Sequence, residues 1–93
     1  MSDGQVNIKP EDLRKFIGEL KQFTSRLNND SNRLHAQFKR LGETWRDQEY
    51  MRFAQEFQQA TKVFNKFNEE SDRYITYLNK KTEAAEEYLR RRL

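Results

Sequence analysis

Leu41-Gly42-Glu43-Thr44-Trp45-Arg46-Asp47, near the middle of the 93-residue chain, is the stretch that decides the fold. It contains an interior glycine, the only tryptophan and a Thr-x-x-Asp sequence. Gly42 is well placed to end one helix in the left-handed conformation. Thr44 can cap the next helix, with Asp47 three residues later in the capping-box position. Together with Trp45, these residues form the predicted turn motif of a helical hairpin.

The residues before this corner have the pattern of one long helix, from about residue 10 to residue 41. Leucine recurs every seven residues over this span, and Pro10 suits the first position of a helix. Asn28-Asn29-Asp30-Ser31-Asn32 are five poor helix formers in a row, which leaves a break at this point as the alternative. Because the seven-residue phase continues through them, we predict an unbroken helix.

The residues after the corner repeat the seven-residue pattern with aromatic side chains, which predicts a second helix over about residues 45–90. A short corner makes the two helices antiparallel neighbours. We therefore predict an all-α chain of two long antiparallel helices joined by a tight turn. The predicted seam, within the hairpin and towards a second hairpin, consists of Leu13, Leu20, Leu27, Leu34, Phe38, Leu41, Phe53, Phe57, Phe64, Phe67, Tyr74 and Leu78.

The whole chain, residues 1–93, is expected to be a single helical-hairpin domain. Residues 1–9 form a flexible N-terminal arm in this interpretation. Counted from a corner at residue 43, the second helix outruns the first after about Leu78, so that residues 79–93 form an overhanging end. This end still carries apolar side chains and is a candidate partner surface, comprising Ala85, Tyr88 and Leu89.

The aromatic content predicts that the hairpin has a partner. Seven Phe, four Tyr and one Trp need more covered surface than a two-helix hairpin provides, because each helix covers only one side of the other. A second hairpin would close a four-helix bundle. We therefore predict a homodimer, with a heterodimer of similar hairpins as the alternative. A larger secreted or surface protein is a further candidate partner.

The sequence carries no pattern of catalytic or cofactor-binding residues. There is no cysteine, and the single histidine, His35, has no Glu-x-x-His or His-x-x-x-His companion that could complete a metal site in a helical bundle. The carboxylates stand mostly beside Lys or Arg on solvated helix faces, and no glycine-rich phosphate loop is present. We therefore predict a protein without enzymatic activity, metal or cofactor.

Charge and hydropathy narrow the classes of partner. The net charge is +3, and Arg90, Arg91 and Arg92 account for as much positive charge as this whole excess. Elsewhere the two signs are mixed, which disfavours a nucleic-acid partner and leaves nucleic-acid or anionic-membrane binding through the Arg-rich end as a minor alternative. No apolar run approaches the ~20 residues of a transmembrane helix, and the N-terminus lacks the pattern of a secretory signal. We expect a cytoplasmic protein, or one secreted without a cleaved signal peptide.

The corner, followed by Phe53 and Phe57, resembles the WXG family of small early-secreted-antigen-like proteins associated with type VII secretion. Pro10-Glu11-x-Leu13 is similar to the usual start of the first helix in that family. The resemblance implies a non-enzymatic bacterial hairpin that forms a homo- or heterodimeric four-helix bundle and acts as a secreted effector, a chaperone-like partner or an adaptor. It also implies that Trp45 packs the corner against the opposite helix of its own or a partner hairpin.

Two features depart from the family pattern. Asp47 stands where the family has glycine, so the motif here is W-x-D. The family's export signal, Tyr-x-x-x-Asp/Glu after the second helix, is absent, because the residue four positions after each of the last three tyrosines is Leu78, Lys81 or Arg92. The sequence thus predicts a dimeric interaction protein, either a partner or adaptor or a leaderless secreted factor linked to a secretion system. A structural coiled-coil element of a cytoplasmic assembly is the alternative.

Overall fold

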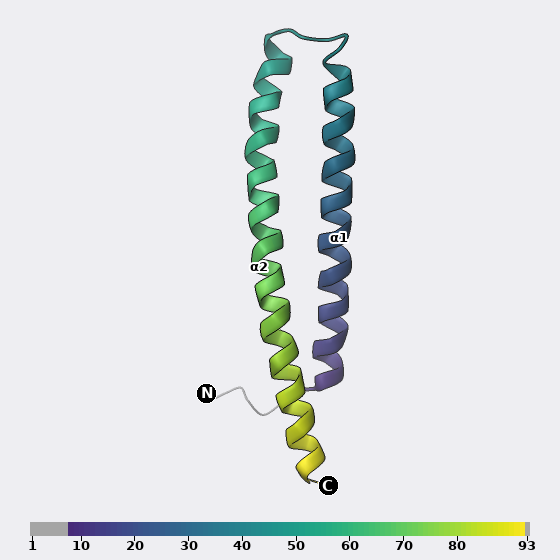
Figure 1. Ribbon diagram of the computed structural model, residues 1–93, viewed down its shortest axis with the longest axis vertical. Helices are drawn as coiled ribbons and strands as arrows, with labels where there is room; N and C mark the ends of the chain where they lie inside the picture. The colour runs from purple at the N-terminus through teal and green to yellow at the C-terminus, as the bar shows by residue number, and fades with distance from the viewer. Residues whose placement is uncertain (1–7, 93) are drawn as a thin grey trace.

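The computed structural model describes residues 8–92 and consists of two long antiparallel helices (Figure 1). Helix α1 spans Pro10–Leu41, and helix α2 spans Gln48–Arg92. The predicted all-α hairpin is confirmed. The molecule measures 67 × 25 × 15 Å, and the smallest of these dimensions is close to the diameter of a single helix with its side chains. The hairpin is therefore one layer of two helices, with two broad faces that residues 8–92 leave uncovered.

Helix α1 runs from Pro10 to its end without interruption, including the Asn28–Asn32 segment. Ser31 of this segment is partly buried, and Asp30 forms an ion pair with Arg33 at 2.5 Å. The continuous helix agrees with the prediction. Its seven-residue pattern keeps Leu20 and Leu27 partly buried on the α2 side, and tertiary contact of this kind overrides weak intrinsic helix propensity.

The core between the helices is one row of side chains deep. The side chains that α2 turns towards α1 are spaced alternately three and four residues apart, as in a coiled coil. Within the described residues, the buried hydrophobic side chains are Ile17, Tyr50, Phe57 and Ile75, and the buried polar residues are Ser71 and Thr82. The partly buried positions of α1 are Leu13, Leu20, Thr24, Leu27, Ser31 and Phe38.

The pairing of the helices is shifted from the predicted one. A corner at residue 43 would place Leu20 opposite Phe67, but the ring of Phe67 instead contacts Phe23, with 5.9 Å between the centroids. The connection is longer than expected, because α2 begins only at Gln48. The extra residues of this connection move α2 along α1 by about three residues.

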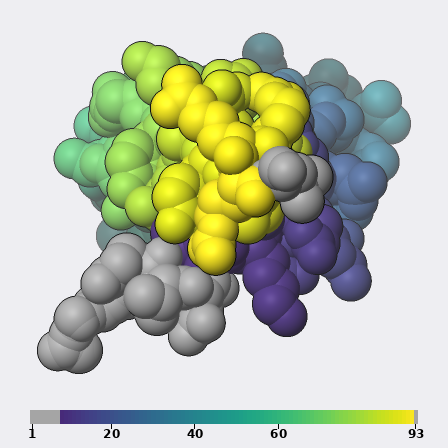
Figure 2. All heavy atoms as spheres, turned by 90° about the horizontal axis from the view of Figure 1, so that it is seen from below, coloured from purple at the N-terminus to yellow at the C-terminus, as the bar shows by residue number. Residues whose placement is uncertain are grey.

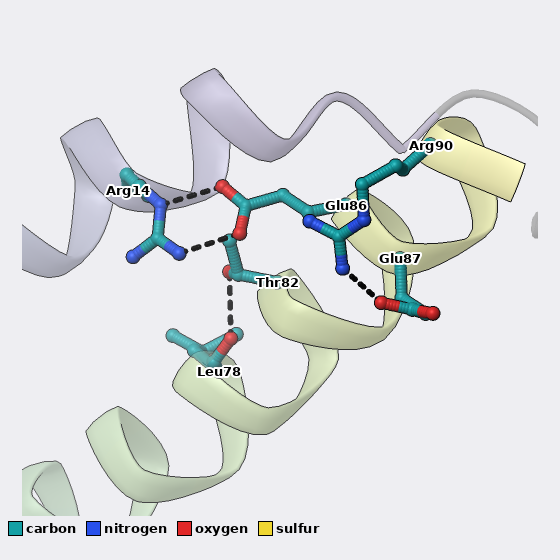
Figure 3. Close-up of polar contacts among 6 residues, drawn as sticks. All are labelled: Arg14, Leu78, Thr82, Glu86, Glu87 and Arg90. Atoms are coloured by element: carbon teal, nitrogen blue, oxygen red, sulfur yellow. Dashed lines mark hydrogen bonds and ion pairs between the residues drawn. The ribbon is translucent and has the colours of Figure 1, made fainter. Parts of the chain in front are cut away.

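This shift shortens the overhanging end of α2. The start of α1 lies against the end of α2, as Figure 2 shows along the long axis from the open end. Arg14 donates hydrogen bonds of 2.8 and 2.7 Å to the two carboxylate oxygens of Glu86 (Figure 3). Thr82 has no exposed surface, and its hydroxyl donates to the carbonyl of Leu78 at 2.7 Å. The prediction that everything after Leu78 lacks an intrachain partner is therefore wrong as far as Glu86. Most of the predicted N-terminal arm, residues 1–7, lies outside the described residues, as does Leu93.

Candidate interaction surface

Gly42 has a different role at the corner from the predicted one. Its backbone lies in the right-handed region, with φ −65° and ψ −12°, so the expected left-handed helix end is wrong. Its N–H donates to the carbonyls of Phe38 and Lys39, which continues the turn of α1. A Cβ atom added to Gly42 would lie 2.2 Å from the hydroxyl oxygen of Tyr50. The close approach of Tyr50 is what requires a residue without a side chain here.

Tyr50 joins α1, the connection and α2 in one cluster. It is 6% exposed, and its hydroxyl donates to the carbonyl of Phe38 at 3.2 Å. Its ring stacks on the ring of Phe38, with 4.4 Å between centroids and 8° between planes. Trp45 meets the same ring edge-on at 5.4 Å. Trp45 therefore packs against its own chain, which is one of the two arrangements that the resemblance implied.

Asp47, and not Thr44, caps α2. The Thr44 hydroxyl lies 3.4 Å from the carbonyl oxygen of Leu41, back towards α1. The Asp47 carboxylate accepts a hydrogen bond of 3.0 Å from the N–H of Tyr50, the third residue of α2. This bond, with a further contribution from the Trp45 side chain, holds the pKa of Asp47 below its ordinary value. The predicted Thr44 cap is wrong because the helix begins three residues later than expected.

This cap gives a physical reason for the W-x-D motif. A glycine in place of Asp47 has no side-chain acceptor for the free N–H groups at the start of α2, whereas a carboxylate accepts one of them and its negative charge faces the positive end of the helix dipole. The acid at this position therefore supports the start of α2 directly.

One broad face of the hairpin exposes large apolar side chains from both helices. Phe23 of α1 and Phe67 of α2 contact each other and are still 47% and 42% exposed. Residues that follow these two at helical spacing lie on the same side of the hairpin. We call this surface the apolar face, and it comprises Phe16, Phe23, Leu34, Leu41, Phe53, Phe67 and Tyr74, each at least two fifths exposed.

The predicted seam residues divide between the core and the apolar face. Phe57 is buried between the helices. Six others are partly buried, namely Leu13, Leu20, Leu27, Phe38, Phe64 and Leu78. The remaining members are exposed on the apolar face, namely Leu34, Leu41, Phe53, Phe67 and Tyr74. The predicted seam lacks the core residues Ile17, Tyr50 and Ile75, which stand three or four positions from its members and could have been found by that spacing.

The opposite broad face is polar. A cavity of about 160 Å³ between the helices on this side has a wall of carboxamide and hydroxyl side chains with one histidine and one aromatic ring, made up of Asn28, Ser31, Asn32, His35, Thr61, Phe64, Asn65 and Asn68. The His35 ring packs edge-on against Phe57 at 5.6 Å. Nowhere along residues 8–92 do three or more His, Cys, Asp or Glu side chains lie together as a metal ion would require. His35 is accordingly a packing residue in this structure.

The predicted partner surface at the end of α2 forms a groove beside the start of the chain. Tyr88 and Leu89 are 60% and 48% exposed, and Ala85 is partly buried. The groove is lined by apolar side chains and two cations, namely Ile8, Lys81, Ala84, Ala85, Tyr88, Leu89 and Arg92. The structure therefore brings the three predicted residues together in one groove.

The arginines at the end of α2 contact other side chains of the same helix. Arg90 and Arg91 both pair with the carboxylate of Glu87, and Figure 3 shows the first of these pairs. The guanidinium of Arg92 lies 5.7 Å from the centre of the Tyr88 ring, a cation–π distance. These contacts reduce the positive field that this end can offer to a phosphate.

The fold and the exposed aromatic stripe define a class of protein, a helical hairpin with one unpaired apolar face. The sequence matches the WXG100 family model, which is described as proteins of 100 residues with WXG, over residues 5–88. The chain belongs to this family, and the resemblance seen at the corner is confirmed. Proteins of this family are non-enzymatic helical proteins that are secreted through type VII systems and typically form dimers. Compared with the curated proteins, the sequence has no match.

Neither α1 nor α2 combines the length and the apolar character that crossing a membrane requires.

Proposed function

We propose that this chain is a non-enzymatic interaction protein that pairs its apolar face with a second helical hairpin and so completes a four-helix bundle. The observation that carries the proposal is the row of half-exposed Phe, Leu and Tyr side chains shared by both helices. Soluble monomers rarely expose a contiguous apolar surface of this length. Burying the remaining surface of each such side chain contributes on the order of 1 kcal/mol.

The layer structure supports the same proposal. A stable domain is normally built from two packed layers around one core, whereas this hairpin is a single layer with a thin core. A second layer on the apolar face supplies the missing half of that core. The first candidate for this layer is a second copy of the chain, and a similar hairpin from another protein is the alternative.

In the cell, we propose that this pairing serves a secretion system. The chain acts either as a factor exported with its partner or as the partner and adaptor of a larger secreted or surface protein. Membership of the WXG100 family supports this role. Binding of nucleic acid or anionic membrane through the Arg-rich end receives no such support, because Arg90 and Arg91 already share Glu87.

The pairing is tested by solution mass. Light scattering coupled to gel filtration should give twice the chain mass of 11.4 kDa for the wild type. Phe67→Glu places a charge in the middle of the apolar face and should give the mass of one chain. The matched control is Asn65→Glu, two residues away on the polar cavity, which should leave the dimer intact. A wild-type mass of one chain that does not change with concentration, from high protein concentration down to micromolar, contradicts the proposal. Circular dichroism must show intact helices for this result to count.

The cellular role is tested in the native organism. Affinity-tagged protein should co-purify with a helical partner or appear in the culture fluid without cell lysis. Phe67→Glu should lose both properties, and Asn65→Glu should keep them. Failure of the wild type in both assays, with a dimer still present in solution, favours the structural coiled-coil role in a cytoplasmic assembly.

A further inference from the structure

The polar face of the hairpin holds a second cavity, which adjoins the one with the carboxamide wall. It has a volume of about 280 Å³ and shares His35 and Thr61 with its neighbour. Three further aromatic residues line it, namely Phe38, Tyr50 and Phe57. We call the two cavities together the polar-face groove. Because the groove lies on the side of the hairpin away from the apolar face, a second hairpin on the apolar face leaves it open.

The carboxamide part of the groove has hydrogen-bonding groups that the hairpin does not use. Among the side-chain hydrogen bonds of residues 8–92, those of this wall are limited to Thr61, whose hydroxyl donates to the carbonyl of Phe57 at 2.9 Å. With its hydrogen engaged, the Thr61 oxygen can only accept from a bound molecule. The carboxamides of Asn28, Asn32 and Asn65 can both donate and accept.

Asn68 supplies the observation that points to a ligand. Its side-chain oxygen is buried and has no hydrogen-bond partner within the part of the chain that the structure describes. A buried acceptor is costly to leave unpaired, so it is normally satisfied by a neighbouring group, an ordered water or a ligand. Asn68 belongs to the wall of the groove. The groove therefore favours a bound molecule that carries O–H or N–H donors.

The charges around the groove narrow the class of ligand. Among the described residues that line either cavity there is no Asp, Glu or Arg, and the cation is Lys39 at the aromatic part. A phosphate is normally held by several cations or a helix N-terminus, and Ca²⁺ or Mg²⁺ by carboxylates. The wall of the groove offers neither arrangement, and it therefore suits a neutral molecule.

The aromatic part of the groove suits the C–H face of a sugar ring. The ring of His35 is exposed and packs edge-on against Phe57, with 5.6 Å between centroids. A neutral sugar combines hydroxyls, which donate and accept as carboxamides do, with C–H surface that can pack on aromatic rings. The two cavities together approach the size of small-molecule sites, which is roughly 300–1,000 Å³.

We propose that the polar-face groove binds a neutral carbohydrate, with the hydroxyls of one sugar unit on the carboxamides around Asn68 and the C–H face of the next unit on His35 and Phe38. A peptide fits this wall less well. An extended peptide pairs with the free edge of a sheet, and a helical peptide needs an apolar groove, whereas this wall presents carboxamide side chains from two helices. The proposal goes beyond the pairing of hairpins and does not depend on it.

Water is the competing occupant of the groove. The carboxamide part, with a volume of about 160 Å³, has room for a few water molecules at about 30 Å³ each. A sugar hydroxyl can replace the hydrogen bonds of a displaced water, and the C–H face displaces further water from the rings. Carbohydrate binding should therefore be specific but weak.

Titration with N,N′-diacetylchitobiose tests the proposal. This disaccharide is neutral and carries hydroxyls, acetamide groups and C–H faces. Two-dimensional amide NMR spectra should show saturable shifts around His35, Thr61 and Asn68, and the side-chain carboxamide signals should move with them. The dissociation constant should be on the order of 1 mM, because an open groove buries few ligand atoms. Signals near Phe23 and Phe67 on the apolar face should stay unchanged.

Two Asn→Leu substitutions provide the matched variants. Asn68→Leu removes the buried acceptor and should weaken binding by roughly 10-fold or more. Because it replaces an unpaired polar group with an apolar one of similar size, the melting temperature should not fall. Asn29→Leu makes the same change at an exposed position of α1 outside the wall of the groove and should keep the wild-type affinity. Asn65→Leu, at an exposed wall position, should weaken binding without any risk to the core.

Three results would overturn the proposal. The absence of saturable shifts up to the highest soluble concentration of the disaccharide would show that the groove holds water only. Shifts confined to the apolar face would place the binding elsewhere. Equal affinities of the wild type, Asn68→Leu and Asn65→Leu would show that the carboxamides do not hold the sugar. The solution mass, which tests the pairing of hairpins, is measured separately and is independent of all three results.

Discussion

The turn end and the open end of the hairpin hold α1 and α2 together by different physical means. At the turn, Tyr50 is buried against Phe38 and Trp45 and donates a hydrogen bond to the backbone of α1. At the open end, Ile17, Ile75 and Thr82 are also buried, but the polar contact that joins the two helices is the ion pair of Arg14 with Glu86, whose side chains are 49% and 38% exposed.

This difference predicts where the two helices separate first. Apolar packing is insensitive to salt and is lost only when the side chains separate, whereas an exposed ion pair is screened by salt and opposed by side-chain entropy. The turn end should therefore be the most protected part of the molecule, and local opening should begin at the free ends. The following predictions test this gradient, from the largest expected effect to the smallest.

Tyr50→Ala should have the largest effect. It removes a buried ring, the stacking contact of this ring with Phe38 and the hydrogen bond from its hydroxyl. The expected loss of unfolding free energy is about 3–5 kcal/mol. Denaturant unfolding at fixed protein concentration measures it, since the proposed dimerisation would make stability concentration-dependent. The control is Tyr77→Ala, because Tyr77 is 55% exposed and its loss should change stability by less than about 0.5 kcal/mol. Equal losses for the two variants would show that the turn cluster has no special role.

Gly42→Ala should destabilise the turn by about 1–3 kcal/mol, because the new Cβ would overlap the buried Tyr50 hydroxyl. The same substitution at Gly18 is the matched control. Gly18 lies within α1 with no atom near the added Cβ, so Gly18→Ala should stabilise the protein by up to about 1 kcal/mol. Opposite signs for one chemical change would confirm that close approach, and not backbone conformation, requires glycine at the turn.

Asp47→Ala should lower the melting temperature by a few degrees at neutral pH, because it removes the cap of α2. The pKa of Asp47 is lowered in the folded state, so the unfolded chain binds more protons at acid pH. The stabilisation by Asp47 is therefore present above the ordinary carboxyl pKa and is lost as the pH falls through the folded value. Thermal scans at pH 7 and pH 3 should show a gap between wild type and variant that narrows at pH 3.

Asp47→Gly also tests whether the carboxylate caps α2, since it introduces the residue typical of the family motif. Glycine at an N-cap is tolerated better than alanine, so this variant should melt between the wild type and Asp47→Ala. A melting temperature above that of the wild type would show that the carboxylate does not stabilise the start of α2.

Arg14→Ala should have the smallest effect, a decrease of no more than about two degrees in melting temperature. The hydrogen bonds from Arg14 lower the pKa of Glu86, which shows that the pair favours the charged carboxylate. High salt should remove most of the difference between variant and wild type. Hydrogen exchange should become faster at the end of α2 and stay unchanged near Tyr50. Faster exchange at the turn would contradict the separation of the two ends.

The helical elements were predictable from the sequence because their signals are repeated many times. The leucines of α1 and the aromatics of α2 recur every seven residues, so a single weak segment such as Asn28–Asn32 does not break the pattern. Pro10 marks the start of α1 correctly. The corner was recognisable for a different reason, namely that Gly42 and the Thr-x-x-Asp sequence after it stand between the two helical patterns.

The details of the corner could not be predicted, because they depend on contacts between residues that are distant along the chain. The clash that excludes a side chain at Gly42 comes from Tyr50, whose position requires both helices to be in place. The choice between Thr44 and Asp47 as the cap depends on where α2 begins, and a helix start is uncertain by a few residues in any sequence pattern. The same uncertainty displaced the expected overhang of α2.

The sequence by itself determined that this protein has two amphipathic helices, that a short corner makes them antiparallel, and that the apolar stripe is too wide for one hairpin. The tertiary structure decided which side chains of the stripe meet across the hairpin and which stay on the apolar face. A seven-residue repeat specifies the angle between side chains on one helix, but not how that helix is rotated towards its neighbour. Contacts such as those of Phe38 with Tyr50 and of Phe23 with Phe67 set this rotation.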